Sequence, residues 1–194
     1  MDQEDILQRL DKLDMEAFTT IDTPHMYKMI IVGGSGLVLL GVISRATQDI
    51  DALEASPEIR HLLAKYDANL RVSTYINNFP YNFEDRLIPL PVGGRKILFY
   101  TCSLEDIVVA KLYSSRDTDR QDLLSENVLK NLDWDRLKHP AFAITSLTVI
   151  CSIGFVLYNS QKASAIFWRV MAVTCGCFFI FDPPKSDTDV ACVG

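Results

Sequence analysis

The sequence lacks features that several common protein classes require. It has no excess of basic residues, because 19 Lys and Arg stand against 25 Asp and Glu, a formal net charge of −6. General binding to a nucleic-acid backbone needs the opposite balance.

The chain has only three histidines (His25, His61 and His139), and they are far apart in sequence. No base-and-nucleophile pattern surrounds them, which argues against a hydrolase triad. Internal repeats and low-complexity segments are also missing.

Cysteine is scarce and irregularly placed. None of the five cysteines forms a CxxC pair. Cys175 and Cys177 are one residue apart in an apolar run without a nearby histidine, which is more typical of small apolar residues than of metal ligands. The first 18 residues are acidic and amphipathic, unlike a secretory signal. We therefore expect a cytoplasmic domain in a reducing compartment.

Hydrophobic periodicity and charge divide the chain into three parts. Residues 1–19 have leucine and isoleucine at helical spacing, which predicts an amphipathic helix. Residues 20–138 alternate short apolar runs with amphipathic segments, and this predicts an α/β domain with a small mixed β-sheet and flanking helices. Residues 139–194 form an apolar tail in which acidic and basic residues balance, so the whole net charge lies before it.

Turn residues set the expected element boundaries inside 20–138. Apolar runs between them predict strands at 26–32, 49–53, 70–76, 86–91 and 96–102. Helical patterns predict helices over 35–45, from 57 to about 66, over 104–115 and over 119–132.

The tail contains two long apolar stretches. Residues 141–161 have no charge, and residues 163–181 have only Arg169. Each is near the ~20 residues that cross a bilayer, which predicts an apolar helical hairpin. Three interpretations stay open: a membrane anchor through 141–181, a pair of core helices or an obligate interface, and a segment not native to the domain.

A glycine turn and two aspartates lie close together in the sequence. Gly33, Gly34 and Ser35 join a predicted strand to a predicted helix, and such a turn directs bare backbone N–H groups outward, as a phosphate requires. Asp49 and Asp51 alternate around Ile50, which places both carboxylates on one face of a strand. Mg²⁺ is the usual partner of such a pair. An ordinary strand-to-helix turn and a solvated strand end are the alternatives for each motif alone.

The combination indicates a site for a metal-bound triphosphate. Thirteen residues separate Gly34-Ser35 from Asp-Ile-Asp. This spacing resembles the DNA-polymerase-β-like nucleotidyltransferase superfamily, and the resemblance implies that the turn holds triphosphate while Asp49 and Asp51 hold Mg²⁺ and activate the acceptor.

A downstream block extends the resemblance. "LEDIVVAKLYSSRDTDRQDLL" (104–124) is similar to nucleotidyltransferase-like proteins of the DUF6036 and AbiEii toxin group, as are "RATQDID" (45–51) and "EDRLIPL" (84–90). The similarity covers about residues 28–138. It implies that Lys111 is catalytic and neutralises phosphate charge. Asp119 and Asp122 also match the downstream motif of that group. It also implies nucleotide binding by Arg45, Thr47 and Arg116.

The residues themselves leave alternatives open. Lys111 could be a surface lysine, and 116–122 could be a salt-bridged helix junction. A third metal carboxylate, usual in two-metal transfer, is missing from 70–76. Glu84 and Asp85 are the nearest substitutes, and we expect neither to reach the aspartate pair, because Arg86 offers them a closer charge partner.

The sequence therefore predicts an Mg²⁺-dependent enzyme that moves a nucleotidyl group from a nucleoside triphosphate to an RNA, protein or small-molecule hydroxyl. The resemblance suggests a toxin–antitoxin or phage-defence setting with a cognate toxin or antitoxin partner. A catalytically silent module that keeps the fold and acts through protein contacts is the alternative.

Overall fold

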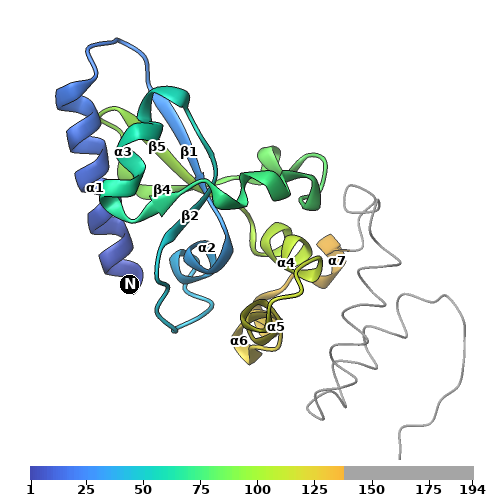
Figure 1. Cartoon of the computed structure of the whole chain (residues 1–194). Helices are drawn as coiled ribbons and strands as arrows, with labels where there is room; N and C mark the ends of the chain where they lie inside the picture. The colour runs from blue at the N-terminus through green and yellow to red at the C-terminus, as the bar shows by residue number, and fades with distance from the viewer. Residues whose placement is uncertain (138–194) are drawn as a thin grey trace, which may run out of the picture.

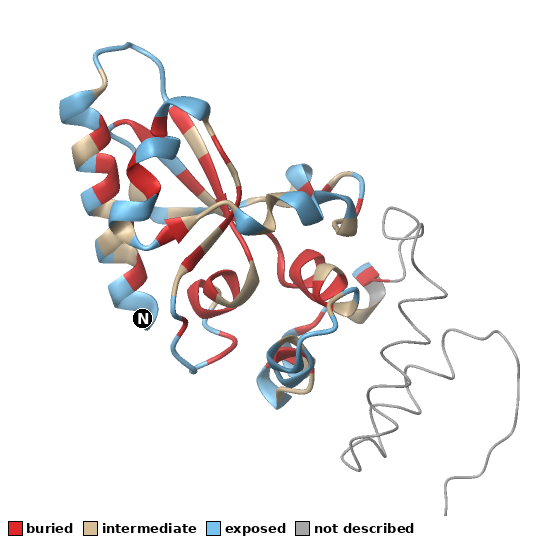
Figure 2. Ribbon diagram, in the orientation of Figure 1, coloured by how far each residue is buried: buried red, intermediate tan, exposed pale blue. Residues whose placement is uncertain are grey.

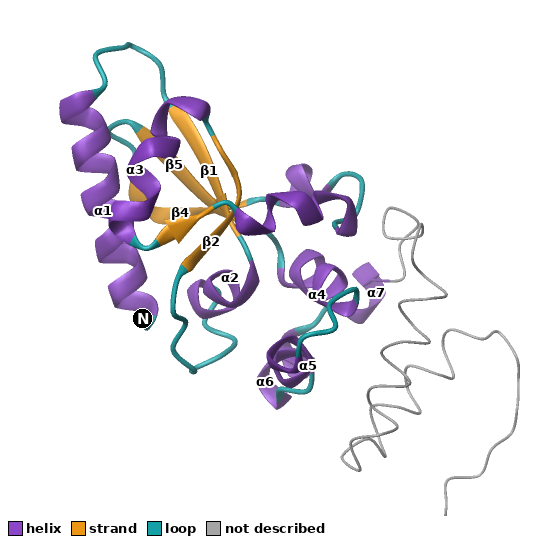
Figure 3. Cartoon of the chain, viewed as in Figure 1, coloured by secondary structure: helices purple, strands orange, loops and turns teal. Residues whose placement is uncertain are grey.

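The computed structural model describes residues 1–137, and a five-stranded mixed sheet organises them, in the order β3-β2-β1-β5-β4 (Figures 1 and 3). β1 runs antiparallel to β2 and parallel to β5. The outer strands pair as β2 parallel to β3 and β4 antiparallel to β5. The strands are β1 (Tyr27–Ile31), β2 (Ile50–Ala55), β3 (Ala68–Asn69), β4 (Ile88–Gly93) and β5 (Ile97–Thr101).

Some helices cover the sheet, and others lie beyond it on one side. Figure 1 shows α1 and α3 beside the sheet, with α4, α5 and α6 gathered away from them. The α-helices are α1 (Gln3–Thr20), α2 (Gly33–Leu39), α3 (Arg60–Leu63), α4 (Leu104–Leu112), α5 (Asp117–Leu123), α6 (Glu126–Asn131) and α7 (Trp134–Leu137). The 3₁₀ segments are η1 (Pro57–Ile59), η2 (Ala64–Tyr66), η3 (Arg71–Asn78) and η4 (Phe83–Arg86). The mixed α/β fold is confirmed.

Burial follows the two periodicities of the sequence (Figure 2). The inner strand β1 is almost entirely buried, in agreement with its apolar run, whereas β2 buries its apolar residues and leaves Asp51 and Glu54 half-buried. Helix α1 buries one stripe of residues: Ile6, Leu10, Leu13 and Ala17.

A buried carboxylate fastens α1 to the sheet. Asp14 has no exposed surface, and its oxygens accept hydrogen bonds from the backbone N–H groups of Arg95, Lys96 and Ile97 at 2.7–3.1 Å. Arg95 also forms an ion pair with it at 3.3 Å. These donors sit where β4 turns into β5, so one side chain fixes the helix against the hairpin.

Three element predictions need correction. Residues 70–76 form the 3₁₀ segment η3 rather than a strand. Val72, Ile76 and Phe79 recur at near-helical spacing, which favours a helical segment over a strand here. The helix predicted over 119–132 is two helices, α5 and α6, separated at Ser125. The helix predicted over 35–45 ends at Leu39, ahead of Gly41, whose φ is +70°.

No helix within residues 1–137 is long and apolar enough to cross a membrane. The apolar hairpin predicted in the tail lies outside the described residues.

Candidate functional site

The glycine turn closes tightly on the second aspartate. The Val32 N–H donates to the Asp51 carbonyl oxygen at 2.9 Å, directly after β1. Gly33 follows with φ +65°, a left-handed conformation in which a side chain is strained. A Cβ at Gly33 would lie 2.9 Å from Asp51 Oδ2. Glycine is therefore required both by the backbone conformation and by the approach of a carboxylate.

Ser35 holds the turn and the strand together. Its buried hydroxyl donates to the Val32 carbonyl at 2.8 Å and accepts from the Asp51 N–H at 3.1 Å. The hydroxyl is therefore used inside the fold, where it positions Asp51. Only the backbone N–H groups of the first turn of α2, which have no partners within the helix, remain for a ligand.

The two aspartates lie together at the start of β2. Asn69 of β3 is the register partner of Asp51, and its amide donates to Asp49 Oδ2 at 2.9 Å. Burial and the nearby charge of Asp49 raise the pKa of Asp51 above its ordinary value, against the opposing influence of Asn69, Arg116 and Lys111. Arg71 approaches Asp49 only to 4.0 Å and is 84% exposed. The pair therefore holds negative charge that nearby cations offset only weakly.

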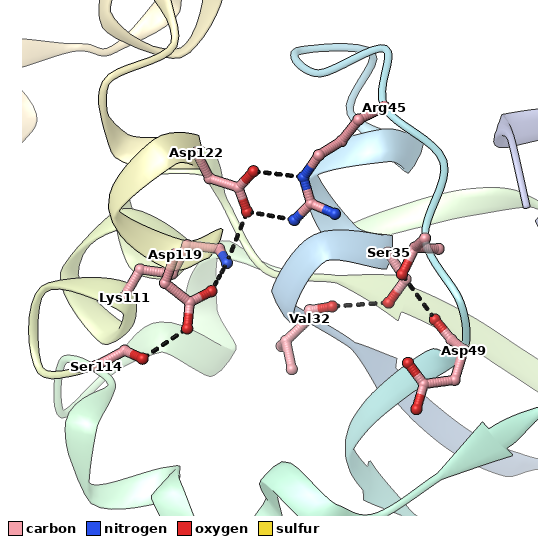
Figure 4. A network of polar contacts seen from close by, with 9 residues as sticks. Val32, Ser35, Arg45, Asp49, Lys111, Ser114, Asp119 and Asp122 are labelled. Carbon is pink, nitrogen blue, oxygen red and sulfur yellow. Dashed lines mark hydrogen bonds and ion pairs between the residues drawn. The ribbon is translucent and has the colours of Figure 1, made fainter. Parts of the chain in front are cut away.

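A second acidic pair lies on the other side of the turn and is closely matched by cations (Figure 4). The Lys111 side chain, on α4, is only 7% exposed and contacts Asp119 and, at 3.0 Å, Asp122 Oδ2 of α5. Arg45 donates to both oxygens of Asp122 at 2.7 Å. Ser114 Oγ donates to Asp119 at 2.6 Å. Lys111 is thus no surface lysine, and the interpretation of 116–122 as a salt-bridged junction agrees with these contacts.

The pKa of Asp122 reflects the cations that surround this carboxylate. Burial alone would raise it, but the hydrogen bonds from Arg45 and the charge of Lys111 outweigh burial and lower the pKa below its ordinary value. The hydrogen bond to Asp122 raises the pKa of Arg45 in turn.

The loop after α2 brings Arg45 and Thr47 beside the turn. A Cβ at Gly34 would lie 3.2 Å from a terminal nitrogen of Arg45 and 3.6 Å from Thr47 Oγ1. Thr47 Oγ1 donates to the Asp49 carbonyl at 3.1 Å. Both residues therefore lie beside the site, where Arg45 bonds to Asp122 and Thr47 to the Asp49 carbonyl.

A cavity of about 200 Å³ opens between the turn, η3 and the start of α5. Five of the residues proposed from sequence line it: Gly33, Gly34, Asp51, Lys111 and Arg116. The other four do not form its wall: Ser35, Arg45, Thr47 and Asp49. Within residues 1–137 the Arg116 guanidinium has no ion-pair partner. It is the cation of this cavity that a ligand can reach without displacing an aspartate.

Glu84 and Asp85 do not complete a metal site. Within the described part of the chain, no group of three or more acidic, histidine or cysteine side chains is arranged to hold a metal ion. Glu84 instead pairs with Lys28 at 2.9 Å, near the opposite end of β1 from the turn. Arg86 forms a two-pronged pair with Asp106, so the partner expected for the two acids is bound elsewhere.

Sequence reasoning missed part of the site. Asn69 was overlooked because a single asparagine carries no motif, and only the pairing of β3 with β2 brings it to the aspartates. Val72 and Tyr75 of η3, which line the cavity, fall within the strand predicted over 70–76. Their near-helical spacing was the available signal.

A protein-family model described as "Nucleotidyltransferase of unknown function (DUF6036)" matches residues 8–154. No curated protein and no solved structure matches the chain. The matched region contains the turn, both acidic pairs and every residue that lines the cavity.

Proposed function

The chain belongs to the DUF6036 family of nucleotidyltransferases, and from this premise we propose that it transfers a nucleotidyl group from a nucleoside triphosphate, with Mg²⁺, to a hydroxyl on RNA, a protein or a small molecule. The observation that carries the proposal is the position of Asp51. Its carboxylate lies against the backbone of Gly33 and beside Asp49, at a cavity, with a raised pKa.

The donor set fits a hard divalent cation. Asp49 and Asp51 offer carboxylate oxygens, and Mg²⁺ is commonly held by one or two carboxylates, with phosphates and water as its other ligands. Such an ion would offset both the burial and the nearby charge of Asp49, which together raise the pKa of Asp51. When bound, it would neutralise charge on the transferring phosphate.

Backbone and cations then position the triphosphate. The backbone N–H groups of the turn at Gly33 and Gly34 would donate hydrogen bonds to phosphate oxygens. Arg116 lines the cavity without an ion-pair partner in residues 1–137. Lys111 Nζ is held in place by Asp119 and Asp122, so it presents a fixed positive charge at the cavity wall.

The chemistry assigned to these residues is a single displacement. The acceptor hydroxyl oxygen bonds to the α-phosphorus, the bond to the bridging oxygen breaks, and pyrophosphate leaves. The hydroxyl proton passes to a carboxylate oxygen of Asp49 or Asp51.

The decisive test is calorimetry on the full chain. We expect Mg²⁺-dependent binding of at least one nucleoside triphosphate, and expect Asp49→Ala/Asp51→Ala to abolish it. Glu58→Ala, an exposed acid on η1, is the matched control and should bind as the unchanged protein does. Absence of binding at millimolar nucleotide, or binding that the double change leaves intact, would refute the proposal. Labelled triphosphates incubated with total RNA then identify nucleotide and acceptor.

A catalytically silent binding module is the second candidate. The lack of a third metal carboxylate among residues 1–137 favours it. Mg²⁺-dependent binding without label transfer to RNA, to protein or to small hydroxyl compounds would support this candidate. The toxin–antitoxin or phage-defence setting, with a cognate partner, stays a prediction from the AbiEii resemblance.

A further inference from the structure

One wall of the cavity is unlike the charged wall that would hold the phosphates. It consists of Tyr75, Asn78 and Phe79 of η3 and the residue after it, facing Tyr113 at the end of α4. We propose that this wall is the subsite for the nucleobase of the triphosphate. The inference rests on the proposed function and names how the same site would recognise its substrate.

The first support is the exposure of two aromatic side chains. Tyr75 is 52% exposed and Tyr113 is 46% exposed, although both line the cavity. Phe79 is held behind them by a tilted contact with Phe83, with ring centroids 5.4 Å apart. Every nucleobase has a flat face that stacks on such rings, and tyrosine supplies the area with little loss of conformational freedom.

Unused hydrogen-bonding groups are the second support. Within residues 1–137, the Asn78 amide and the hydroxyls of Tyr75 and Tyr113 have no hydrogen-bond partner. An asparagine amide offers one donor and one acceptor side by side, the pattern that pairs with a base edge. Stacking would therefore hold a base, and Asn78 would discriminate between bases.

The third support is continuity with the phosphate side. The same cavity is lined by Gly33, Asp51 and Arg116 as well as by Tyr75 and Tyr113. Its volume of about 200 Å³ is below the range typical of sites that enclose a whole ligand. A triphosphate at the turn with its base against η3 would use both walls, leaving the sugar open to an acceptor.

The experiment separates base from phosphate. Each of the four nucleoside triphosphates and inorganic tripolyphosphate are titrated with Mg²⁺ into the full chain and into Tyr75→Ala, Tyr75→Phe and Asn78→Ala. Tyr81→Ala is the matched control, because Tyr81 is 91% exposed and does not line the cavity. Circular dichroism and thermal unfolding check that each variant is folded.

We expect Tyr75→Ala to weaken nucleotide binding about tenfold and to leave tripolyphosphate unchanged. Tyr75→Phe keeps the stacking ring and should recover most of the binding that Tyr75→Ala loses. Tyr81→Ala should bind as the unchanged protein does, and Asn78→Ala should level the affinities for the four bases. Equal loss for nucleotide and tripolyphosphate, or no loss, would overturn the base subsite while leaving the proposed function standing. Loss confined to an RNA acceptor would also overturn it, since the wall would then hold the acceptor's base. No nucleotide binding by the unchanged protein would overturn both.

Discussion

Two acidic pairs flank the same glycine turn, and they differ in what surrounds them. Asp119 and Asp122 face Lys111 and Arg45, and the pKa of Asp122 is lowered. Asp49 and Asp51 receive one amide and a distant arginine, and the pKa of Asp51 is raised. The first pair is satisfied by the protein itself. Within residues 1–137 the second pair lacks a matching positive charge, which is typical of carboxylates at a ligand-binding site.

The two adjacent glycines each serve one of these pairs. Gly33 gives room to Asp51, and Gly34 gives room to Arg45, the cation of the satisfied pair. Adjacent residues of the turn thus approach two different groups. Gly34 lies beside Arg45 of the ion network, and Gly33 lies beside Asp51 of the candidate binding site. Substitutions on either side should have effects of different kinds.

The largest effect is expected from removing the unmatched pair. Asp49→Asn/Asp51→Asn should lower nucleotidyl transfer by about 10³-fold or more, because a bound metal contributes several kcal/mol to the transition state. The free energy of unfolding should stay the same or rise, since two repelling charges are lost. Urea unfolding beside the transfer assay measures both. A marked loss of stability would show that Asp49 and Asp51 also stabilise the fold, so that the two pairs would not differ in this respect.

The next largest effect falls on the matched pair. Asp122→Asn should lower the free energy of unfolding by about 2–3 kcal/mol, because it leaves the buried Lys111 with one carboxylate and Arg45 with none. The value is below that of a fully buried pair, since Arg45 is 44% exposed.

The control for Asp122→Asn is Asp117→Asn on the same helix. Asp117 is 89% exposed, and its contact with Arg120 is 3.7 Å long. Its substitution should change stability by less than about 0.5 kcal/mol. Equal effects at the two positions would mean that the buried network contributes nothing special.

The glycines give a smaller and sharper contrast. Gly33→Ala should destabilise by about 1–2 kcal/mol, because φ is +65° and the new Cβ would meet Asp51 Oδ2 at 2.9 Å. It should also weaken Mg²⁺-dependent nucleotide binding, since Asp51 must move. Gly34→Ala meets only the movable tip of Arg45 at 3.2 Å and should stay within about 0.5 kcal/mol. Thermal unfolding and calorimetry of both variants check this, and an inverted order would contradict it.

The smallest effect is a pH dependence of opposite sign for the two pairs. The folded pKa of Asp51 lies above its ordinary value of 3.8, so ionised Asp51 destabilises the apo fold at neutral pH. Asp51→Asn should therefore raise Tm by about 2 °C at pH 7, a gain that disappears as the pH falls through the folded pKa towards 3.8. The folded pKa of Asp122 is lowered instead, so its contribution is present above 3.8 and lost as the pH falls below it.

Tm measured from pH 3 to pH 8 on both asparagine variants tests this sign difference. At pH 7 the Tm of Asp51→Asn should be higher than that of the unchanged protein, and the Tm of Asp122→Asn should be lower. Both differences should disappear as the pH falls. Curves that shift in the same direction would show that the two pairs have the same electrostatic environment.

The sequence predicted local features of this site better than its long-range ones. Gly33, Asp49 and Asp51 follow from a motif confined to one strand–helix–strand unit, and Gly33 and Asp51 do approach closely. Lys111 came from the downstream resemblance, and it lines the same cavity.

What could not be predicted depends on pairings between distant segments. The bond between Arg45 and Asp122 joins residues 77 apart, and no local pattern specifies it. Asn69 reaches the aspartates only through the two-residue strand β3. The strand expected at 70–76 is wrong because this segment is a 3₁₀ helix, from which Val72 and Tyr75 line a cavity instead of pairing in a sheet.

The carboxylate of Asp14 also has a consequence for the order in which the protein is made. Its three backbone donors at 95–97 lie 81–83 residues later in the chain. A ribosome adding ~5–20 residues per second would deliver them roughly 4–16 s after α1 emerges. During that interval the apolar stripe of α1, including Ile6, Leu10 and Leu13, has no β4–β5 hairpin to cover it. The nascent α1 thus lacks its contacts with β4 and β5 until the last strand of the sheet is synthesised, although its partners α2 and α3 are made earlier.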